Sequence, residues 1–239
     1  MTILCLLLFT FISHQSWALE SGFISSVPGL SIPNSHTIYE DAQGTAVLRG
    51  MEPRSKAQVQ ELASLGIEHV LIFKTDTKGE VAKEITHLKA AGFSNKAITH
   101  IPFPWKDLHD FRQACSMTIQ ALQVIEKSLQ RQHSIFFHCT VGEDRTGYLA
   151  GLWGLWSQTY ASVDQAFRNE MCERGYEAGN PKKPYRQVVA KIRETLTPTY
   201  LKMALLLDEA RRRGQYLDES LCEQEPVLNI SLKKYQCRG

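Results

Sequence analysis

The strongest constraint on the fold of this chain is one continuous run, residues 134–156. It opens with "SIFF", a short apolar segment typical of a strand buried on both faces. It closes with "YLAGLWGLW", an apolar segment that suits a buried helix. Between them, the ten residues "HCTVGEDRTG" are mostly small or polar and include two glycines. A buried strand that passes through a tight loop into a buried helix predicts a sheet with parallel strands.

The rest of the chain continues this alternation of strands and helices. Further strands are predicted at 46–50, 67–73 and 97–103, and helices at 55–66, 80–92, 111–129 and 163–175. Ser55 and Ser162 are the expected N-caps, and Gly66 and Gly92 the expected helix ends. The predicted fold class is therefore α/β, with a mostly parallel central sheet flanked by helices. Two extra C-terminal helices are expected at 185–196 and 198–213.

The two ends of the chain have a different character from its middle. Residues 1–18 are predicted to be a signal peptide, with an apolar core from Ile3 to Ile12 and small residues before a cleavage site after Ala18. That core is too short to span a bilayer, so no stable membrane insertion is expected after cleavage; an uncleaved anchor or a buried first segment is the alternative. Residues 19–44 should be irregular, 45–213 a single domain, and 214–239 a polar tail. The expected destination is the periplasm, the exterior, or another cell to which the protein is delivered.

The cysteine count agrees with an oxidising compartment. Without residues 1–18 five cysteines remain, so one thiol stays free while the other four can form two disulfides. Cys222 and Cys237 flank the tail and are the simplest pair to expect, although the sequence leaves the pairing open. Cys115, on the apolar face of a predicted helix, is equally compatible with a small buried hydrophobe.

Charge and motif content limit the partners that the chain can have. The net charge is only +2, which gives no global field toward nucleic acid or a membrane surface. Neither an HExxH motif nor a CxxC pair occurs, so no metal site and no cofactor are expected.

The loop at 138–147 carries the residues that point to chemistry. Backbone N–H groups at a helix start bind anions, and Gly142 lets the loop curl so that successive amides face inward. Arg145 adds a planar pair of donors that matches two phosphate oxygens. The same positive field should lower the pKa of the Cys139 thiol, which predicts a thiolate nucleophile that solvent can reach. The loop is therefore predicted to hold a phosphoryl group above Cys139.

The pattern Cys-x5-Arg-Thr, with His138 before it, resembles the signature of the cysteine-dependent protein tyrosine and dual-specificity phosphatases. "LRGMEPRSKAQVQELASLGIEHVLIF" and "RNEMCERGY" also resemble segments of compact bacterial members, so the similarity spans about residues 45–196. The resemblance implies hydrolysis of phosphotyrosine, and also of phosphoserine or phosphothreonine if the pocket is shallow, through a cysteinyl-phosphate. It implies catalytic roles for Cys139, Arg145 and Asp107, substrate binding by Thr140, Val141, Gly142, Glu143, Asp144 and Arg145, and supporting roles for His138 and Thr146. His138 would hold the loop and support the thiolate, and Thr146 would hydrogen-bond the sulfur or, alternatively, cap the helix.

A leaving alkoxide or phenolate needs a proton, and the family takes it from an aspartate upstream of the cysteine. Asp107, in "PFPWKDLHD", is the preferred candidate. Asp110 is better explained as an acidic residue at a helix start, and Asp76 as a turn former.

Other functions fit parts of the same pattern. A phosphate-binding module without turnover would use the loop but would not need the acid. A phosphoinositide phosphatase is disfavoured because Glu143, placed at the rim of the pocket, should repel polyanions. A sulfur transferase of the rhodanese type also uses a loop cysteine, but the spacing from Cys139 to Arg145 suits phosphate better. The expected partner is a phosphorylated protein or a small phosphomonoester.

Overall fold

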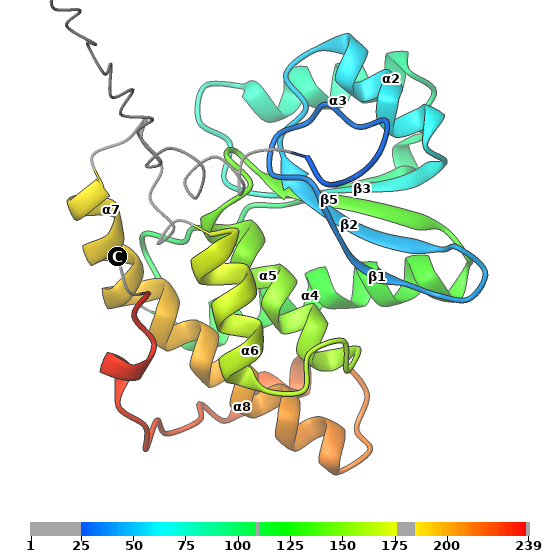
Figure 1. Ribbon diagram of the computed structural model, residues 1–239. Helices are drawn as coiled ribbons and strands as arrows, with labels where there is room; N and C mark the ends of the chain where they lie inside the picture. The colour runs from blue at the N-terminus through cyan, green and yellow to red at the C-terminus, as the bar shows by residue number, and fades with distance from the viewer. Residues whose placement is uncertain (1–24, 109, 176–184, 238–239) are drawn as a thin grey trace, which may run out of the picture.

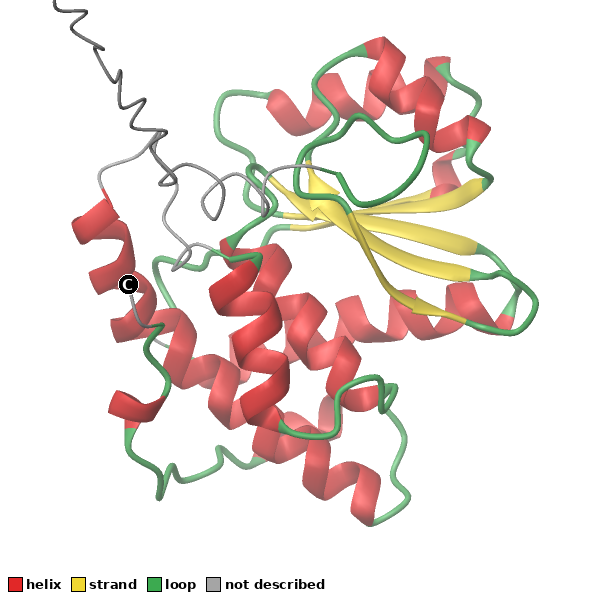
Figure 2. Cartoon of the chain, viewed as in Figure 1, coloured by secondary structure: helices red, strands yellow, loops and turns green. Residues whose placement is uncertain are grey.

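The computed structural model describes residues 25–108, 110–175 and 185–237, and it has a five-stranded sheet with helices on both faces. The strands are β1 (His36–Glu40), β2 (Ala46–Met51), β3 (Ile67–Phe73), β4 (Ile98–Ile101) and β5 (Ser134–Cys139). Their order across the sheet is β1-β2-β5-β3-β4. Figure 2 shows the strands as one twisted layer with helices above and below it. The predicted α/β class is confirmed.

The sheet is parallel except at one edge. β5 pairs in parallel with β2 and with β3, and β4 pairs in parallel with β3, whereas β1 is antiparallel to β2. The register places Met51 opposite Cys139, so the carboxyl ends of the parallel strands lie along one edge of the sheet. Ligands bind beyond this edge in α/β proteins. The loop that follows β5 begins there.

The two faces of the sheet are covered by different helices (Figure 1). Helices α2 (Lys56–Ser64) and α3 (Glu80–Ala90) cover one face and share a core with Leu48, Val70 and Phe136. Helices α4 (Phe111–Gln130) and α5 (Asp144–Trp156) cover the other face, and α8 (Thr197–Arg212) packs against these two helices. Of these, α5 is buried almost along its whole length, as its continuous apolar sequence predicts.

The predicted helix starts are confirmed by side-chain caps. Ser55 accepts a hydrogen bond from the backbone N–H of Gln58 at the start of α2, and Ser162 accepts one from Gln165 at the start of α6 (Val163–Phe167). Asp110 caps α4 by accepting from the backbone N–H of Arg112. Such caps satisfy N–H groups that have no partner inside the helix, so they are local signals that a sequence reveals directly.

Several predicted elements differ in the structure. The segment 19–44 is not irregular throughout, because β1 pairs with β2 there. The predicted helix after Ser162 is short and passes into a π-helical turn, η2 (Arg168–Glu173). The two predicted C-terminal helices form an unbroken helical run from α7 (Tyr185–Lys191) through a second π-helical turn, η4 (Ile192–Leu196), into α8.

The disulfide pairing also differs from the simplest expectation. Cys115 pairs with Cys222 and Cys172 pairs with Cys237, so a bond between Cys222 and Cys237 is wrong. The tail passes first along α4, through a short 3₁₀ turn, η5 (Glu219–Glu223), and reaches η2 only at its end, so its two cysteines meet different helices. Cys139 is the free thiol among the described residues, as predicted.

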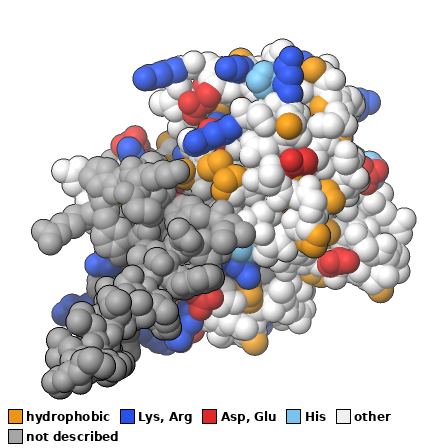
Figure 3. All heavy atoms as spheres, turned by 45° about the horizontal axis from the view of Figure 1, so that its top comes forward, with side chains coloured by type: hydrophobic (Ala, Val, Ile, Leu, Met, Phe, Trp, Pro, Cys, Tyr) orange, Lys and Arg blue, Asp and Glu red, His pale blue; other side chains and the backbone are white. Residues whose placement is uncertain are grey.

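The predicted signal peptide, residues 1–18, lies outside the described residues. Within 25–108, 110–175 and 185–237, the structure contains no helix with the length and apolarity needed to cross a membrane. On the face shown in Figure 3, which carries α2 and α3, acidic and basic side chains are interspersed.

Candidate active site

The site is built on the loop that connects β5 to α5. Gly142, in the middle of this loop, has a φ of +73°, a backbone conformation that glycine adopts at little cost. A Cβ atom on Gly142 would lie 2.6 Å from the backbone of Gly50 and Met51, so the loop packs directly against the end of β2. Farther along, Gly147 lets the first turn of α5 lie against the backbone of Glu170 in η2. Both glycines therefore serve close backbone packing.

Cys139 ends β5 and lies at the base of the loop. Its backbone N–H donates to Oγ1 of Thr146 at 2.8 Å, and Thr146 in turn hydrogen-bonds the sulfur through its hydroxyl and its backbone N–H. Burial alone raises the pKa of the thiol, and the Asp144 carboxylate acts in the same direction. The charge of Arg145 and the hydrogen bonds from Thr146 outweigh them, so the pKa of Cys139 lies below its ordinary value. Thr146 lies inside α5 and not at its N-cap, so the capping alternative is wrong.

The expectation that Cys139 is open to solvent is wrong. Its exposed fraction is 0%, because the loop folds over the end of β5 and packs on β2. The next two residues of the loop, Thr140 and Val141, are partly exposed.

Arg145 lies in the first turn of α5 and is only 8% exposed. One Nη atom donates to Oγ1 of Thr140 at 3.4 Å, while the buried Nε has no hydrogen-bond partner among the described residues. A buried N–H without a partner is costly unless a ligand satisfies it. Together with the helix N-terminus, this donor fits an oxyanion.

The lowered pKa of Cys139 leads to a testable expectation for its reactivity. Thiolate is the form that iodoacetamide alkylates, so the rate of Cys139 alkylation should reach its plateau at a lower pH than an ordinary thiol with a pKa of 9.0. The absolute rate should be slow because the sulfur is covered. The measurement is the pH midpoint of alkylation, followed on the Cys139 peptide by mass spectrometry. A midpoint at or above the value in a denatured control would contradict the assignment of Arg145 and Thr146 as stabilisers of the thiolate.

His138, on β5, contacts both the backbone of Cys139 and helix α3. Its Nδ1 donates to the carbonyl of Cys139 at 3.2 Å, and its Nε2 pairs with Oε1 of Glu84 at 2.7 Å. Burial lowers the pKa of His138, but the Glu84 carboxylate outweighs this effect and raises the pKa above its ordinary value. Glu84 and Glu52 also pair with the fully buried Lys74. His138 therefore links the backbone of Cys139 to α3, and its hydrogen bonds go to the Cys139 carbonyl and Glu84 and not to the sulfur.

Two residues that the sequence analysis did not single out also hold the loop. The Gly142 carbonyl accepts hydrogen bonds from Nη2 of Arg49 on β2 and, at 2.7 Å, from Nδ2 of Asn34. The signal for Arg49 was present: it is an arginine inside an otherwise apolar predicted strand, and it has no exposed surface. Such a charge is retained when it has a partner inside the protein.

Glu143 does not lie at the rim of the pocket, where the sequence analysis placed it. It is 1% exposed, since the loop turns inward at Gly142 and carries the following residues below the surface. Asp144 is buried as well. Repulsion of polyanions by an exposed Glu143 is therefore wrong as an argument against phosphoinositides.

Asp107 lies on the loop after β4, at the sheet edge that also carries Cys139. It is exposed, and its carboxylate makes no hydrogen bond or ion pair with another described residue. The loop itself is anchored, because Trp105 is nearly buried and its carbonyl accepts from Oγ1 of Thr195 at 3.1 Å. Asp110 caps α4, and Asp76 accepts from the backbone N–H of Val81 at 3.4 Å, as expected for residues with structural roles.

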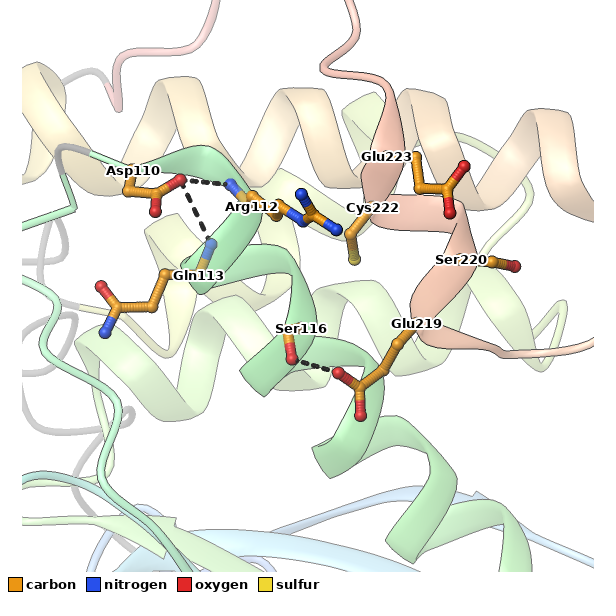
Figure 4. Close-up of a pocket in the computed structure, with 8 residues that line it drawn as sticks. All are labelled: Asp110, Arg112, Gln113, Ser116, Glu219, Ser220, Cys222 and Glu223. Atoms are coloured by element: carbon orange, nitrogen blue, oxygen red, sulfur yellow. Dashed lines mark hydrogen bonds between the residues drawn. The ribbon is translucent and has the colours of Figure 1, made fainter.

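Outside the Cys139 loop, the described surface has a hollow without a free thiol. A polar hollow lies between the start of α4 and η5, lined by Asp110, Arg112, Gln113, Ser116, Glu219, Ser220, Cys222 and Glu223 (Figure 4). Its cysteine is already in a disulfide. Within 25–108, 110–175 and 185–237, no group of three or more His, Cys, Asp or Glu side chains is arranged to hold a metal ion.

Comparison with solved structures finds similar folds at low identity. Kinase associated phosphatase (KAP) is 14% identical, with 71% of this chain and 88% of that chain covered and a TM-score of 0.40. TpbA of P. aeruginosa is 19% identical, with 66% and 86% covered and a TM-score of 0.43. The core catalytic domain of the PP-IP phosphatase SIW14 of S. cerevisiae is 17% identical, with 54% and 73% covered and a TM-score of 0.41. No curated protein sequence matches the chain.

The sequence itself matches a family directly. Residues 45–155 match the tyrosine phosphatase family, and this range runs from the start of β2 almost to the end of α5. It includes the loop with Cys139 and Arg145. At such low structural identities and TM-scores, the assignment depends on this sequence match. The similarity to the tyrosine phosphatase family thus covers residues 45–155, a little under half of the chain.

Proposed function

We propose that the protein is a cysteine-dependent phosphatase that hydrolyses phosphotyrosine, and also phosphoserine and phosphothreonine, in proteins through a cysteinyl-phosphate. The observation that carries the proposal is the position of Arg145. Its buried Nε has no hydrogen-bond partner among the described residues, and its charge lowers the pKa of Cys139 in the same loop. A thiolate beside a guanidinium whose Nε has no partner among the described residues, at a helix N-terminus, suits a phosphoryl group.

The proposed reaction has two displacements. Cys139 Sγ attacks phosphorus, the bond from phosphorus to the ester oxygen breaks, and Asp107 gives its proton to that oxygen. Water then attacks the cysteinyl-phosphate while Asp107 takes a proton from it, and the S–P bond breaks to release phosphate. Thr146 hydrogen-bonds the sulfur that leaves in this second step. Arg145 and the loop amides receive the charge that builds on the phosphoryl oxygens in both steps.

We also propose that the protein is exported. Two disulfides link the described tail to α4 and to η2, and structural disulfides persist mainly in oxidising compartments. The expected signal peptide at 1–18 is consistent with this proposal. The test is the N-terminal residue of the protein recovered from its natural compartment, with Leu19 expected. Recovery from a reducing cytosol with Met1 retained would refute export.

The proposed acid gives the experiment that tests the activity. Purified protein should hydrolyse p-nitrophenyl phosphate with a bell-shaped pH profile and a mildly acidic optimum, because a thiolate and a protonated carboxyl must coexist. Asp107→Asn should lower kcat by about 10²-fold, the usual contribution of general acid–base catalysis. The loss should be larger for an alkyl phosphate than for p-nitrophenyl phosphate, since the poorer leaving group needs the proton more. The basic limb of the pH profile should also disappear.

Asp110→Asn is the matched control for this variant. Asparagine caps helices as well as aspartate does, so this change on the same loop should leave the pH profile as it is. Equal effects of the two substitutions would remove Asp107 from the mechanism. If the wild type turns over no phosphomonoester yet binds phosphopeptides, the protein is a binding module and the enzymatic proposal is wrong.

A further inference from the structure

The loop that connects β5 to α5 is called the phosphate loop from here on, and the orientation of one of its peptide groups is held from outside the loop. The carbonyl of Gly142 accepts from Arg49 and Asn34, as described above. In a trans peptide the N–H of the next residue points away from that carbonyl, so these bonds also set the direction of the Glu143 N–H. Gly142 is the loop residue with the greatest backbone freedom. The orientation of the peptide group between Gly142 and Glu143 therefore depends on the groups that hold Arg49 and Asn34 in place.

Both residues are held by the segment that contains η2. The carboxylate of Glu170 pairs with Arg49 through Oε2, and through Oε1 it accepts from the Tyr160 hydroxyl and, at 2.9 Å, from Arg174. The backbone carbonyl of Arg174 accepts from Asn34 at 2.9 Å and from Arg49 at 3.2 Å. Burial and the nearby Glu170 carboxylate raise the pKa of Tyr160, which keeps its hydroxyl protonated as a donor.

Glu170 and Arg49 have no exposed surface, and a buried ion pair is a weak source of stability. An apolar pair of similar volume would fill the same space. What an apolar pair cannot do is donate to the Gly142 carbonyl. The contacts of Arg49 therefore connect the carboxylate of η2 directly to the phosphate loop.

The same segment is fixed to the C-terminal tail. Cys172, two residues after Glu170, forms the disulfide with Cys237. The Tyr235 hydroxyl donates to Asp164 on α6 at 2.7 Å, and its nearly buried ring packs edge-on against Phe167. The last described residues of the chain thus lie against the segment that holds the loop.

We propose that Glu170 is a positioning residue for the phosphate loop and that the Cys172–Cys237 disulfide keeps its segment in place. The effect of this positioning on catalysis rests on the proposed function, whereas its effect on the geometry of the loop does not. Glu170 acts through Arg49 and Gly142 and does not touch the substrate. The C-terminal tail then helps to set the geometry of the site, in addition to stabilising the core.

The two disulfides provide a test with a matched control. The double variant Cys172→Ser/Cys237→Ser releases η2, and Cys115→Ser/Cys222→Ser removes the bond that holds η5 to α4. The cysteines of the control pair are 107 residues apart in sequence and those of the test pair 65, so the control should lose at least as much stability by chain entropy. A purely structural role therefore predicts that the control is affected as strongly as the test variant.

The readouts are the pH midpoint of Cys139 alkylation and the inhibition constant of orthophosphate, each measured where both variants are folded by circular dichroism. The test variant should raise the alkylation midpoint and weaken orthophosphate binding about tenfold, equivalent to about 1.4 kcal/mol. The control should change neither. Turnover is not used for this comparison. The control disulfide, Cys115–Cys222, lies beside the first turns of α4 (Figure 4), and α4 begins close to Asp107, so its loss could change turnover through the proposed acid.

Single variants examine the carboxylate itself. Glu170→Gln keeps the shape of the side chain and removes its charge, and should shift both readouts in the same direction as the disulfide variant. Combining the two changes should add little, because they act on one segment. If Glu170→Gln does not fold, Tyr160→Phe, which removes one donor to Glu170, should give a smaller shift of the same sign.

Equal midpoints and inhibition constants for the two disulfide variants would overturn the inference. So would a folded Glu170→Gln protein that matches the wild type in both readouts. A failure of the proposed function is a separate result: the wild type would then not hydrolyse p-nitrophenyl phosphate. The alkylation midpoint would still report whether Glu170 positions the loop.

Discussion

Replacing Cys139 with serine is expected to lower kcat for p-nitrophenyl phosphate by a factor on the order of 10⁴ or more, since it removes the nucleophile outright. The serine hydroxyl has nearly the size of the thiol, but its much higher pKa leaves it protonated at a site that lowers the pKa of the thiol. Arg145 and the loop amides remain, so the variant should still bind orthophosphate. The measurement is steady-state hydrolysis beside calorimetric titration with orthophosphate.

The position of Cys139 makes this variant a clean one. The side chain is buried without a disulfide partner, and a serine hydroxyl can accept the hydrogen bonds that Thr146 gives to the sulfur. Stability should therefore change little, and thermal unfolding provides the check. A Cys139→Ser protein that keeps a substantial share of the activity would show that another group attacks phosphorus. A variant that loses orthophosphate binding as well would show that the sulfur shapes the loop.

How far the sequence could predict this structure follows from the range of the interactions involved. Most of the predicted strands and helices, the caps at Ser55 and Ser162, and the strand–loop–helix unit around 138–147 depend on patterns of a few neighbouring residues, and these predictions are confirmed. The parallel sheet follows from their order along the chain. Cys139, Arg145 and Thr146 come together because one strand–loop–helix unit carries all three.

The parts that were missed depend on contacts between distant segments. Arg49 meets Gly142 and Glu170 across 93 and 121 residues of sequence, and no local pattern joins them. The disulfide pairing depends on the path of the tail across α4 and η2, which the spacing of cysteines does not reveal. Burial of Glu143 follows from the turn at Gly142 against β2, a packing detail that composition does not encode.

The proposed proton donor, Asp107, has the sequence position expected of the acid, but its carboxylate is exposed in the structure. Asp107 follows β4, and Cys139 ends β5, at the same edge of the sheet, with β3 between the two strands. Its carboxylate is exposed, whereas Arg145 and Cys139 are buried. The pH profile of Asp107→Asn therefore decides whether this exposed carboxyl is the proton donor.

Substitution of Arg145 by lysine is expected to lower kcat/KM by a factor on the order of 10³, the scale on which an arginine stabilises a phosphoryl transition state. Lysine keeps the positive charge but loses the planar pair of donors, so it cannot bind two phosphoryl oxygens at once. Methionine, of similar length and uncharged, should lower kcat/KM at least as much and should also raise the pKa of Cys139, because the charge of Arg145 helps to hold that pKa down.

The two substitutions therefore separate two roles of one side chain. Lysine should change turnover while the alkylation midpoint of Cys139 moves little, and methionine should change both. The measurements are kcat/KM for p-nitrophenyl phosphate and the alkylation midpoint of the Cys139 peptide, with circular dichroism to show that the nearly buried position tolerates each change. If methionine leaves the alkylation midpoint at its wild-type value, Arg145 does not stabilise the thiolate. The low pKa would then come from Thr146 and the loop amides, and the arginine would serve the phosphoryl group alone.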